Sequence, residues 1–355
     1  MSKLLVAGCG SIGMRHIRNL ISLGVDVAAC DVDSRRLEET THSYELTGYA
    51  KLAAALEQKW DGVVIASPSI FHYSQTMECL NRDLPVFVEK PMATSVAEAK
   101  MIEDLAIKRK SILLNGFNMR FHPLIIRVKE ILDEGLIGRV FAIRAMAGYY
   151  LPDWHPERDY RQGYSARADL GGGALSDGIH ELDYIRYFFG DIKQVYCVGG
   201  KHSDLDIDTE DMVELVMKCC NGMYAEVHLN YLNRTRVREF VIVGEDGIIK
   251  WDSTEQSVKL FETKDRCWKV YGVEFEFQIN DTYVLEMKHF LRCICGEEES
   301  INGASDGRAS VEIISCAKES MQTGQPVLIS NCAQAGTSDG TVLDETNVFG
   351  RRKAR

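Results

Sequence analysis

The sequence predicts an α/β protein in which an N-terminal domain with a parallel sheet precedes an α/β domain with a mostly antiparallel sheet. Two observations carry this prediction. Over residues 3–115, short apolar runs alternate with helical patterns, which is typical of a parallel sheet. From residue 140 onward, strands follow one another and many alternate apolar with polar residues, as in a sheet with one wetter face.

Composition bounds the class of protein. The chain has 355 residues, enough for two domains, and its hydrophobic and charged fractions of 45% and 26% are ordinary for a globular protein. A net charge of −11 argues against nucleic-acid binding. No run approaches a membrane span, so no membrane partner is expected. Eleven cysteines without a CxxC pair predict reduced, mostly buried thiols, no metal site and a cytoplasmic location.

The first elements predict a dinucleotide site. A strand at 3–7 runs into Gly8-Cys-Gly10-Ser-Ile-Gly13, a helix at 13–21 follows, and a strand at 25–30 ends at Asp31. Gly8 permits a tight turn, Gly10 lets the backbone approach a pyrophosphate, and Gly13 lets helix and strand pack closely. The helix N-terminus, with Ser11 and Ile12, offers free N–H groups to the anion.

Asp31 indicates which dinucleotide is bound. Its carboxylate can accept hydrogen bonds from both ribose hydroxyls, and its charge would repel a 2′-phosphate. NAD is therefore favoured over NADP. Arg35 and Arg36 follow closely and weaken this preference, and Arg36 is counted among the cofactor contacts.

Further strands are expected at 62–66, 85–88 and 111–115, and their carboxyl ends should share the ligand-binding edge of the sheet. Lys90 lies at one such end, before Pro91, where an ammonium can stabilise a developing alkoxide. The alternative is an ordinary solvated lysine. The candidate cofactor contacts at these ends are Ser67, Pro68, His72, Glu89, Lys90 and Asn118.

A helix expected over 173–189 carries His180 near the centre of its polar face, which also includes Ser176, Asp177 and Asp183. An imidazole there can accept the proton of an alcohol. The plainer alternative is a solvated amphipathic helix that happens to contain a histidine.

Together these motifs resemble the glucose-fructose oxidoreductase / inositol dehydrogenase (Gfo/Idh/MocA) family over roughly residues 1–330. The resemblance implies a Rossmann domain, a second domain with a large open sheet that supports homodimers or homotetramers, a nicotinamide cofactor, and a sugar, cyclitol or polyol substrate. It makes Lys90 and His180 the catalytic lysine and histidine, and Asp177 the acid before the histidine. The matching segments are the glycine turn, Asp31, Ala66-Ser67-Pro68 with His72, Glu89-Lys90-Pro91, Gly171-Gly172-Gly173, and Asp177 to Asp183.

One departure affects Asp177. Family members usually place the acid four residues before the histidine, whereas Asp177 lies three before His180 and Ser176 takes the fourth position. Either spacing keeps acid and histidine on neighbouring turns of one helix. Three roles stay open for Asp177: it orients His180, it contacts a substrate hydroxyl, or it caps the helix.

The chain is divided into a cofactor domain at 1–121, a substrate-binding and oligomerisation domain at 122–330 and a flexible tail at 331–355. The second domain should begin with a helix at 123–134. Strands are expected at 140–150, 194–199, 211–218, 223–231, 238–244 and 248–252, and helices at 281–296 and 304–321.

The segment 149–164 is dense in aromatic and charged residues and predicts a substrate lid, with an oligomer contact as the alternative. Three arginines later in the chain either contact the substrate or lie on an exposed strand: Arg234, Arg236 and Arg238. Besides Asp177 and His180, the candidate substrate contacts are Arg120, Tyr150, Trp154, His155, Tyr160 and Arg161.

The function expected is NAD-dependent hydride transfer at a hydroxyl or keto carbon of a sugar, sugar acid, amino sugar or cyclitol. His180 would take the proton and Lys90 would hold the oxyanion. Two alternatives remain open: an NAD-using glycoside hydrolase or lyase that oxidises its substrate transiently, and a non-catalytic NAD-binding sensor.

Overall fold

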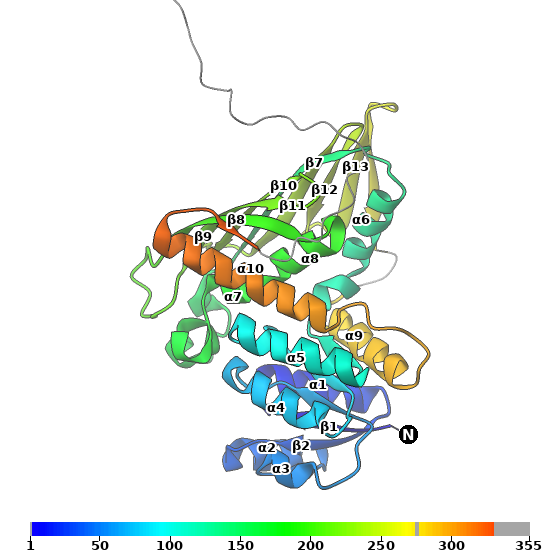
Figure 1. Cartoon of the computed structure of the whole chain (residues 1–355), viewed down its shortest axis with the longest axis vertical. Coiled ribbons are helices and arrows are strands. Elements are labelled where there is room, and N and C mark those ends of the chain that lie inside the picture. Colours follow the sequence, from blue (N-terminus) through cyan, green and yellow to red (C-terminus); the bar gives the residue numbers. More distant parts are fainter. Residues whose placement is uncertain (1, 274–276, 330–355) are drawn as a thin grey trace, which may run out of the picture.

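The computed structural model describes residues 2–273 and 277–329, which form two sheets with helices between them (Figure 1). The first sheet is parallel, with the strand order β3-β2-β1-β4-β5-β6. This is the doubly wound order in which ligands bind at the carboxyl ends of the strands. The strands are β1 Lys3–Ala7, β2 Asp26–Cys30, β3 Thr47–Tyr49, β4 Gly62–Ile65, β5 Val86–Val88 and β6 Leu113–Asn115.

Helices cover both faces of this sheet, as the alternating sequence pattern predicts. The short strand β3 and the one-turn helix α3 were not expected, because neither contains enough apolar residues to show a period. The helices of this domain are α1 Ser11–Ser22, α2 Ser34–Tyr44, α3 Leu52–Ala55, α4 His72–Leu80 and α5 Val96–Arg109.

The second sheet has nine strands in the order β14-β13-β12-β11-β7-β10-β9-β8-β15. Of the described strand pairs in this sheet, β7 and β10 are parallel and the others are antiparallel. The mostly antiparallel prediction is thus confirmed, although β13 to β15 were not expected. The strands are β7 Val140–Gly148, β8 Ile192–Gly200, β9 Met212–Cys219, β10 Tyr224–Asn230, β11 Val237–Gly244, β12 Gly247–Asp252, β13 Ser257–Glu262, β14 Cys267–Gly272 and β15 Val327–Leu328.

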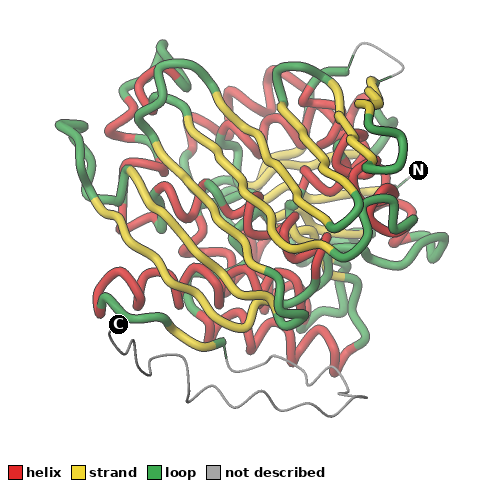
Figure 2. Tube along the Cα trace, turned by 90° about the horizontal axis from the view of Figure 1, so that it is seen from above, coloured by secondary structure: helices red, strands yellow, loops and turns green. Residues whose placement is uncertain are grey.

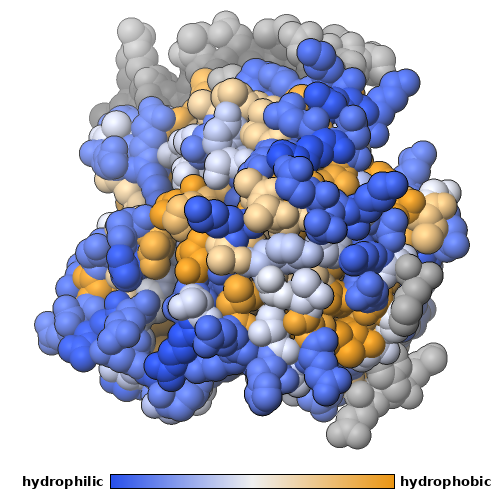
Figure 3. Space-filling view, turned by 90° about the horizontal axis from the view of Figure 1, so that it is seen from below, coloured by the Kyte–Doolittle hydropathy of each residue, from blue (hydrophilic) through white to orange (hydrophobic). Residues whose placement is uncertain are grey.

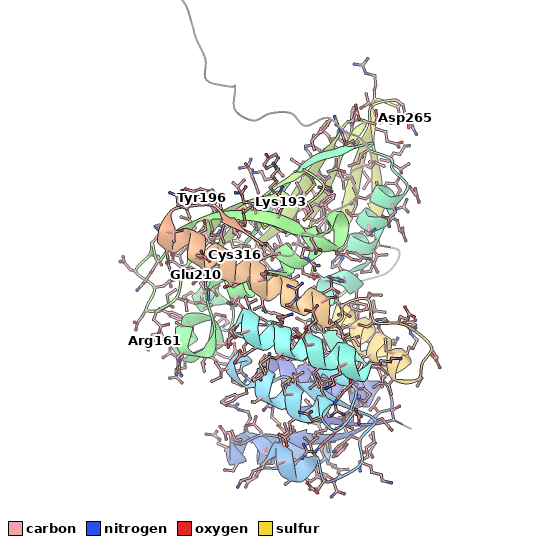
Figure 4. The ribbon with its side chains drawn as sticks, viewed as in Figure 1. Arg161, Lys193, Tyr196, Glu210, Asp265 and Cys316 are labelled. Atoms are coloured by element: carbon pink, nitrogen blue, oxygen red, sulfur yellow. The ribbon has the colours of Figure 1, made fainter. Side chains whose placement is uncertain are left out.

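One face of the nine-stranded sheet is covered and the other is open. Helices α6 (Pro123–Asp133), α8 (Ile179–Phe189) and α10 (Ala304–Thr323) pack against the inner face. Seen from above, the strands cross the molecule with the helices beneath them (Figure 2). Tyr196 on β8 is exposed on this outer side (Figure 4).

The last two helices join the domains. Helix α9 (Ile279–Ile294) returns to the first sheet, where Met287 and Phe290 pack with Leu4 of β1. Helix α10 runs between the two layers (Figure 1), with Val311 in the core of the first domain and Ile314 in that of the second. The chain therefore crosses back to the cofactor domain after residue 278.

The helix expected over 173–189 is in fact two helices. Helix α7 (Ala174–Asp177) ends at Gly178, where α8 begins. A Cβ atom at Gly178 would lie 2.4 Å from a side-chain carbon of Leu229 on β10, so the backbone lies against the sheet there. The polar residues of the segment are buried, with His180 7% and Asp183 0% exposed, and the solvated-helix alternative is wrong.

Nine cysteines are free thiols, and six of these are buried. Cys220, however, is disulfide-bonded, contrary to the expectation of reduced thiols. Within the described ranges, none of the helices has the length and apolarity to cross a bilayer. On the face seen in Figure 3, hydrophilic side chains surround scattered apolar patches. The tail expected at 331–355 lies outside the described residues.

Candidate active site

The glycine turn after β1 fits a dinucleotide. A Cβ atom at Gly13 would lie 1.8 Å from the carbonyl oxygen of Gly8, so helix α1 and the turn touch as predicted. A Cβ atom at Gly10 would meet nothing within 4 Å, which leaves room for a pyrophosphate. Gly10 caps α1 without a side-chain hydrogen bond, and Ser11 and Ile12 form its first turn. The first backbone N–H groups therefore point to an open anion site.

Asp31 lies at the end of β2 and is 8% exposed. Its Oδ2 accepts a hydrogen bond from the backbone N–H of Cys9 at 2.7 Å, and its Oδ1 accepts one from Asp33 at 2.9 Å. These bonds hold the carboxylate beside the glycine turn. Arg36 lies 3.6 Å from the same carboxylate, so its charge is close to where a ribose would bind.

The ends of β4 and β5 are held together by His72. Its Nε2 lies 2.8 Å from the carbonyl oxygen of Ser67, and its Nδ1 lies 2.7 Å from that of Pro91. The imidazole is buried, and burial lowers its pKa. Pro68 caps the short helix that leads into α4. His72 thus positions the corner that carries Lys90 instead of presenting its ring to a ligand.

Glu89 also faces the interior. Its Oε1 lies 2.6 Å from Nε2 of the fully buried His16, and its Oε2 accepts a hydrogen bond from the backbone N–H of Lys90. Burial raises the pKa of Glu89, but the hydrogen bonds and positive charges of His16 and Lys90 together outweigh it, and the net shift is downward. Glu89 was predicted as a cofactor contact, whereas both of its oxygens are engaged by the protein.

A cleft of about 380 Å³ lies between the carboxyl edge of the first sheet and the inner side of the second. It brings together Lys90, Asp177 and His180, which are far apart in the sequence. Asn118 also lines it, and its side-chain amide donates to the hydroxyl of Thr282 at 2.7 Å. The further lining residues are Arg15, Ala147, Gly148, Tyr149, Trp154, His155, Ala174, Gly178, Leu229, Asn230, Tyr231, Arg236, Val237, Arg238, Ile279 and Tyr283.

Lys90, Asp177 and Tyr231 form a chain of contacts in this cleft. The Nζ of Lys90 donates to Oδ1 of Asp177 at 3.3 Å, and the hydroxyl of Tyr231 donates to Oδ2 at 2.7 Å. The side chains of Lys90 and Asp177 are 19% and 13% exposed, so the pair is accessible from the cleft. Asp177 therefore contacts the lysine, and no hydrogen bond to His180 is present among the described residues.

His180 is buried with one edge on the cleft. Burial first, and then the charges of Lys90 and Arg238, hold its pKa well below the ordinary value. Its Nδ1 has no hydrogen-bond partner among the described residues. The imidazole is therefore neutral at pH 7, and a neutral imidazole can accept a proton.

Arg238 reaches the cleft from β11 and lies 2.8 Å from the carboxylate of Glu181, on the helix of His180. Glu181 is fully buried, and burial raises its pKa despite the nearby guanidinium. The ion pair links α8 to β11 and places a positive charge near His180.

The predicted substrate contacts divide into two groups. Trp154 and His155 line the cleft, and the Trp154 ring packs edge-on against Tyr231 with centroids 5.4 Å apart. The other four candidates are not among the described residues that line it. These are Arg120, Tyr150, Tyr160 and Arg161.

Each of those four has another partner. The ring of Tyr150 lies under Arg234, the Tyr160 hydroxyl accepts from the backbone N–H of Asp206, and Arg161 pairs with Asp159. Arg161 lies at the outer edge of its loop (Figure 4). The aromatic and charged content of the segment 149–164 thus serves partly to fold the loop on itself.

Arg120 is a structural residue. It is 3% exposed and binds Asp183 through two hydrogen bonds, of 2.6 and 2.9 Å. It also donates to Asp306 and to the carbonyl of Ile301. The Arg120 guanidinium therefore links α8 to Ile301 and to the start of α10. The same contact explains why Asp183 is charged and buried on the polar face of α8.

We expect Arg120→Met to destabilise the protein by about 3–5 kcal/mol, because the fully buried Asp183 would lose its partner. Urea denaturation followed by circular dichroism measures the change. Arg35→Met is the control, since Arg35 forms an exposed pair with Glu39. The double variant Arg120→Met, Asp183→Leu should recover part of the loss. An Arg120→Met midpoint equal to that of the control would contradict this role.

Sequence reasoning missed Arg15, Asn230, Tyr231 and Tyr283 as cleft residues. Asn230 ends β10, beside the strand β7 that leads into the predicted lid, and Tyr231 follows it directly. Tyr283 lies on α9, whose return to the first domain gives no local signal. Arg236 and Arg238 were left open between substrate and surface, and both line the cleft.

No group of three or more His, Cys, Asp or Glu side chains that could hold a metal ion occurs in the described part of the chain.

Two family models match the chain. The oxidoreductase family with an NAD-binding Rossmann fold matches residues 2–117, and the GFO/IDH/MocA C-terminal domain matches residues 125–250. Among curated relatives, myo-inositol 2-dehydrogenase of Thermotoga maritima is 27% identical over 338 residues, which is 91% of this chain and 97% of the relative. Inositol 2-dehydrogenase of Rubrobacter xylanophilus is 25% identical over 335 residues, 90% of this chain and 91% of the relative.

Solved structures agree in fold. An oxidoreductase from Agrobacterium radiobacter in complex with NAD+, L-tartaric acid and magnesium superposes with a TM-score of 0.81 at 22% identity, covering 92% of this chain and 98% of that one. Levoglucosan dehydrogenase in complex with NADH gives 0.84 at 18% identity, with coverage of 92% and 98%. The glycine turn, the two sheets and the matched models together show that this chain is an NAD-binding oxidoreductase of the GFO/IDH/MocA family.

Proposed function

We propose that the protein is an NAD-dependent dehydrogenase that oxidises a secondary hydroxyl of a sugar, sugar acid, amino sugar or cyclitol. The observation that carries this proposal is the meeting of Lys90, Asp177 and His180 in one cleft at the carboxyl edge of the first sheet. Hydroxyl oxidation needs a hydride acceptor, an acceptor for the proton and a donor to the oxygen. This cleft can supply the last two, and a bound nicotinamide would supply the first. The names of the inositol dehydrogenase relatives support a polyol substrate.

NAD is the proposed cofactor. The N–H groups at the start of α1, with Gly8, Gly10 and Gly13, would hold the pyrophosphate, and Asp31 would bind the ribose hydroxyls. The Asp31 carboxylate disfavours a 2′-phosphate, although Arg36 at 3.6 Å reduces that discrimination. When bound, the nicotinamide supplies the acceptor for the hydride.

The catalytic roles of His180 and Lys90 follow from the charge of each side chain. His180 is neutral and would accept the hydroxyl proton at a ring nitrogen as the C–H bond breaks. Lys90 would donate a hydrogen bond to the same oxygen and stabilise the charge that develops on it. In the reductive direction, the protonated imidazole would return the proton to the carbonyl oxygen.

Asp177 would position the lysine. Its carboxylate holds Nζ of Lys90 at 3.3 Å, while Tyr231 holds the carboxylate from the other side. The ion pair between Asp177 and Lys90 keeps the ammonium at the cleft and offsets part of the free energy lost when this charge is removed from water. This assignment differs from the orienting of His180, which the sequence spacing left open.

The open face of the nine-stranded sheet would form a homodimer or homotetramer contact. Large apolar side chains remain exposed on these strands, as expected of a face that packs against a second copy. They include Phe141, Tyr196, Val198, Val216, Tyr224, Trp268 and Val270. Sedimentation of the wild type and of Val216→Lys tests this, and a wild-type monomer would contradict it. We also propose a cytoplasmic location, which the nine free thiols support.

A dehydrogenase screen tests the proposed function. The purified protein would be assayed at 340 nm with NAD and NADP in parallel against neutral sugars, uronic acids, amino sugars and inositols. We expect NADH formation with at least one polyol and higher kcat/KM with NAD than with NADP. Firm NADH binding without oxidation of any polyol would argue for a binding protein instead.

A further inference from the structure

The cleft carries more positive than negative charge. Four of its lining side chains are permanent cations: Arg15, Lys90, Arg236 and Arg238. Two of them have carboxylate partners, since Lys90 pairs with Asp177 and Arg238 pairs with Glu181. Their charges are thus balanced within the protein.

Arg15 and Arg236 have no carboxylate within ion-pair distance among the described residues. The chain has a net charge of −11, so the two unbalanced arginines do not follow from an excess of basic residues.

Arg15 would lie on the cofactor side of the cleft. It lies on α1, the helix whose N-terminus faces the proposed pyrophosphate site, and its guanidinium stacks 4.5 Å from the ring centre of Tyr283. Arg236 comes from the other domain, directly before β11. It therefore faces the part of the cleft where the substrate must lie.

Arg236 is exposed on the open side of the cleft, where Arg238 also lies. Its partial desolvation in the cleft, followed by the positive charge of Arg238, lowers its pKa. Oxidised NAD adds a further positive charge on its nicotinamide ring. An anion bound to the substrate side of the cleft would remove this repulsion, and a guanidinium binds carboxylate and phosphate oxygens in a two-pronged geometry.

We propose that the substrate is an anionic polyol, whose carboxylate or phosphate group binds Arg236 while its hydroxyl faces His180 and Lys90. This inference rests on the proposed function and narrows it. It excludes neutral sugars and cyclitols as the preferred substrates.

Matched substrates test the inference. Glucose, galactose and mannose would each be compared with their uronates and their 6-phosphates, which separates carboxylate from phosphate recognition. Two quantities are measured: kcat/KM with NAD, and the Kd for each compound on the protein–NADH complex by calorimetry. We expect an anionic form to have a kcat/KM on the order of tenfold or more above that of its neutral parent, and a Kd lower by a similar factor.

Variants assign the effect to Arg236. Arg236→Gln should raise the ratio of the anionic to the neutral Kd by on the order of 10- to 100-fold, because the anion loses its partner, and Arg236→Lys should keep part of the preference for the anion. Arg234→Gln is the matched control, because Arg234 stacks on Tyr150 and does not line the cleft. That variant should keep the wild-type ratio.

The possible failures are distinguishable. The proposal of an anionic substrate fails if neutral polyols are oxidised at least as well as their anionic forms, or if Arg236→Gln keeps the wild-type ratio of Kd values. The proposed dehydrogenase activity is unaffected by either result. Failure of every anion to bind the NADH complex also overturns the inference. If NADH itself does not bind, the proposed function fails first.

Discussion

Replacing Lys90 with methionine should reduce kcat by on the order of 10²–10³-fold while the Kd for NADH stays within about twofold, because only the transition state develops charge on the substrate oxygen. Methionine keeps the length of the side chain and removes the ammonium that lies 3.3 Å from Asp177. Stopped-flow measurement of NADH formation gives the rate, and fluorescence titration gives the Kd.

The same variant has a second consequence. The positive charge of Lys90 helps to hold the pKa of His180 down, after the larger effect of burial. Removing it favours the protonated imidazole, so the acid limb of the residual activity should move to higher pH. Lys100→Met is the control, since Lys100 is exposed on α5. Wild-type kcat in Lys90→Met would rule out the oxyanion role.

Replacing His180 with alanine should lower kcat/KM for oxidation by on the order of 10²–10⁴-fold, because the hydroxyl proton would lose its acceptor. In the wild type, the pKa of His180 lies well below 6.5 and the imidazole is neutral above that pH. Oxidation should therefore stay level as the pH falls to 6.5 and decline only well below it.

His42→Ala is the control for this variant, since His42 is exposed on α2, away from the cleft. The pH profile separates catalysis from structure, because a merely structural histidine would leave the acid limb in place. An acid limb that is unchanged in the residual activity of His180→Ala would count against a proton-accepting role.

Local signals explain why the first domain could be predicted from the sequence. The turn from Gly8 to Gly13, the strands on either side of it and Asp31 all lie within one continuous segment. Their glycine spacing and apolar runs dictate the geometry directly. Lys90 and His180 could be placed because each follows a recognisable motif.

Contacts distant in sequence explain most of what could not be predicted. Arg120 looked like a substrate ligand because it follows a strand end, but its partners Asp183 and Asp306 lie 63 and 186 residues further on. Glu89 likewise contacts His16, which lies 73 residues earlier in the chain. A buried ion pair and a ligand contact use the same residue types, and only the tertiary structure separates them.

The break at Gly178 is a third case. The apolar and polar pattern of residues 173–189 fits one helix, and glycine inside a helix is only mildly unfavourable. The close contact with Leu229 of β10 ends α7 there instead. Asp177, at the end of α7, contacts Lys90 and Tyr231. The spacing of one continuous helix therefore does not predict how Asp177 lies relative to His180.

The proposed reaction is net transfer of a hydride from the substrate to NAD, with His180 and Lys90 at the reacting hydroxyl. The most direct measurement is the stoichiometry of NADH and keto product in one reaction, by absorbance at 340 nm and mass spectrometry. We predict one NADH for each keto product, with both lost in Lys90→Met and His180→Ala. Product that accumulates without NADH would instead show transient oxidation, as in a glycoside hydrolase or lyase, and would contradict the account.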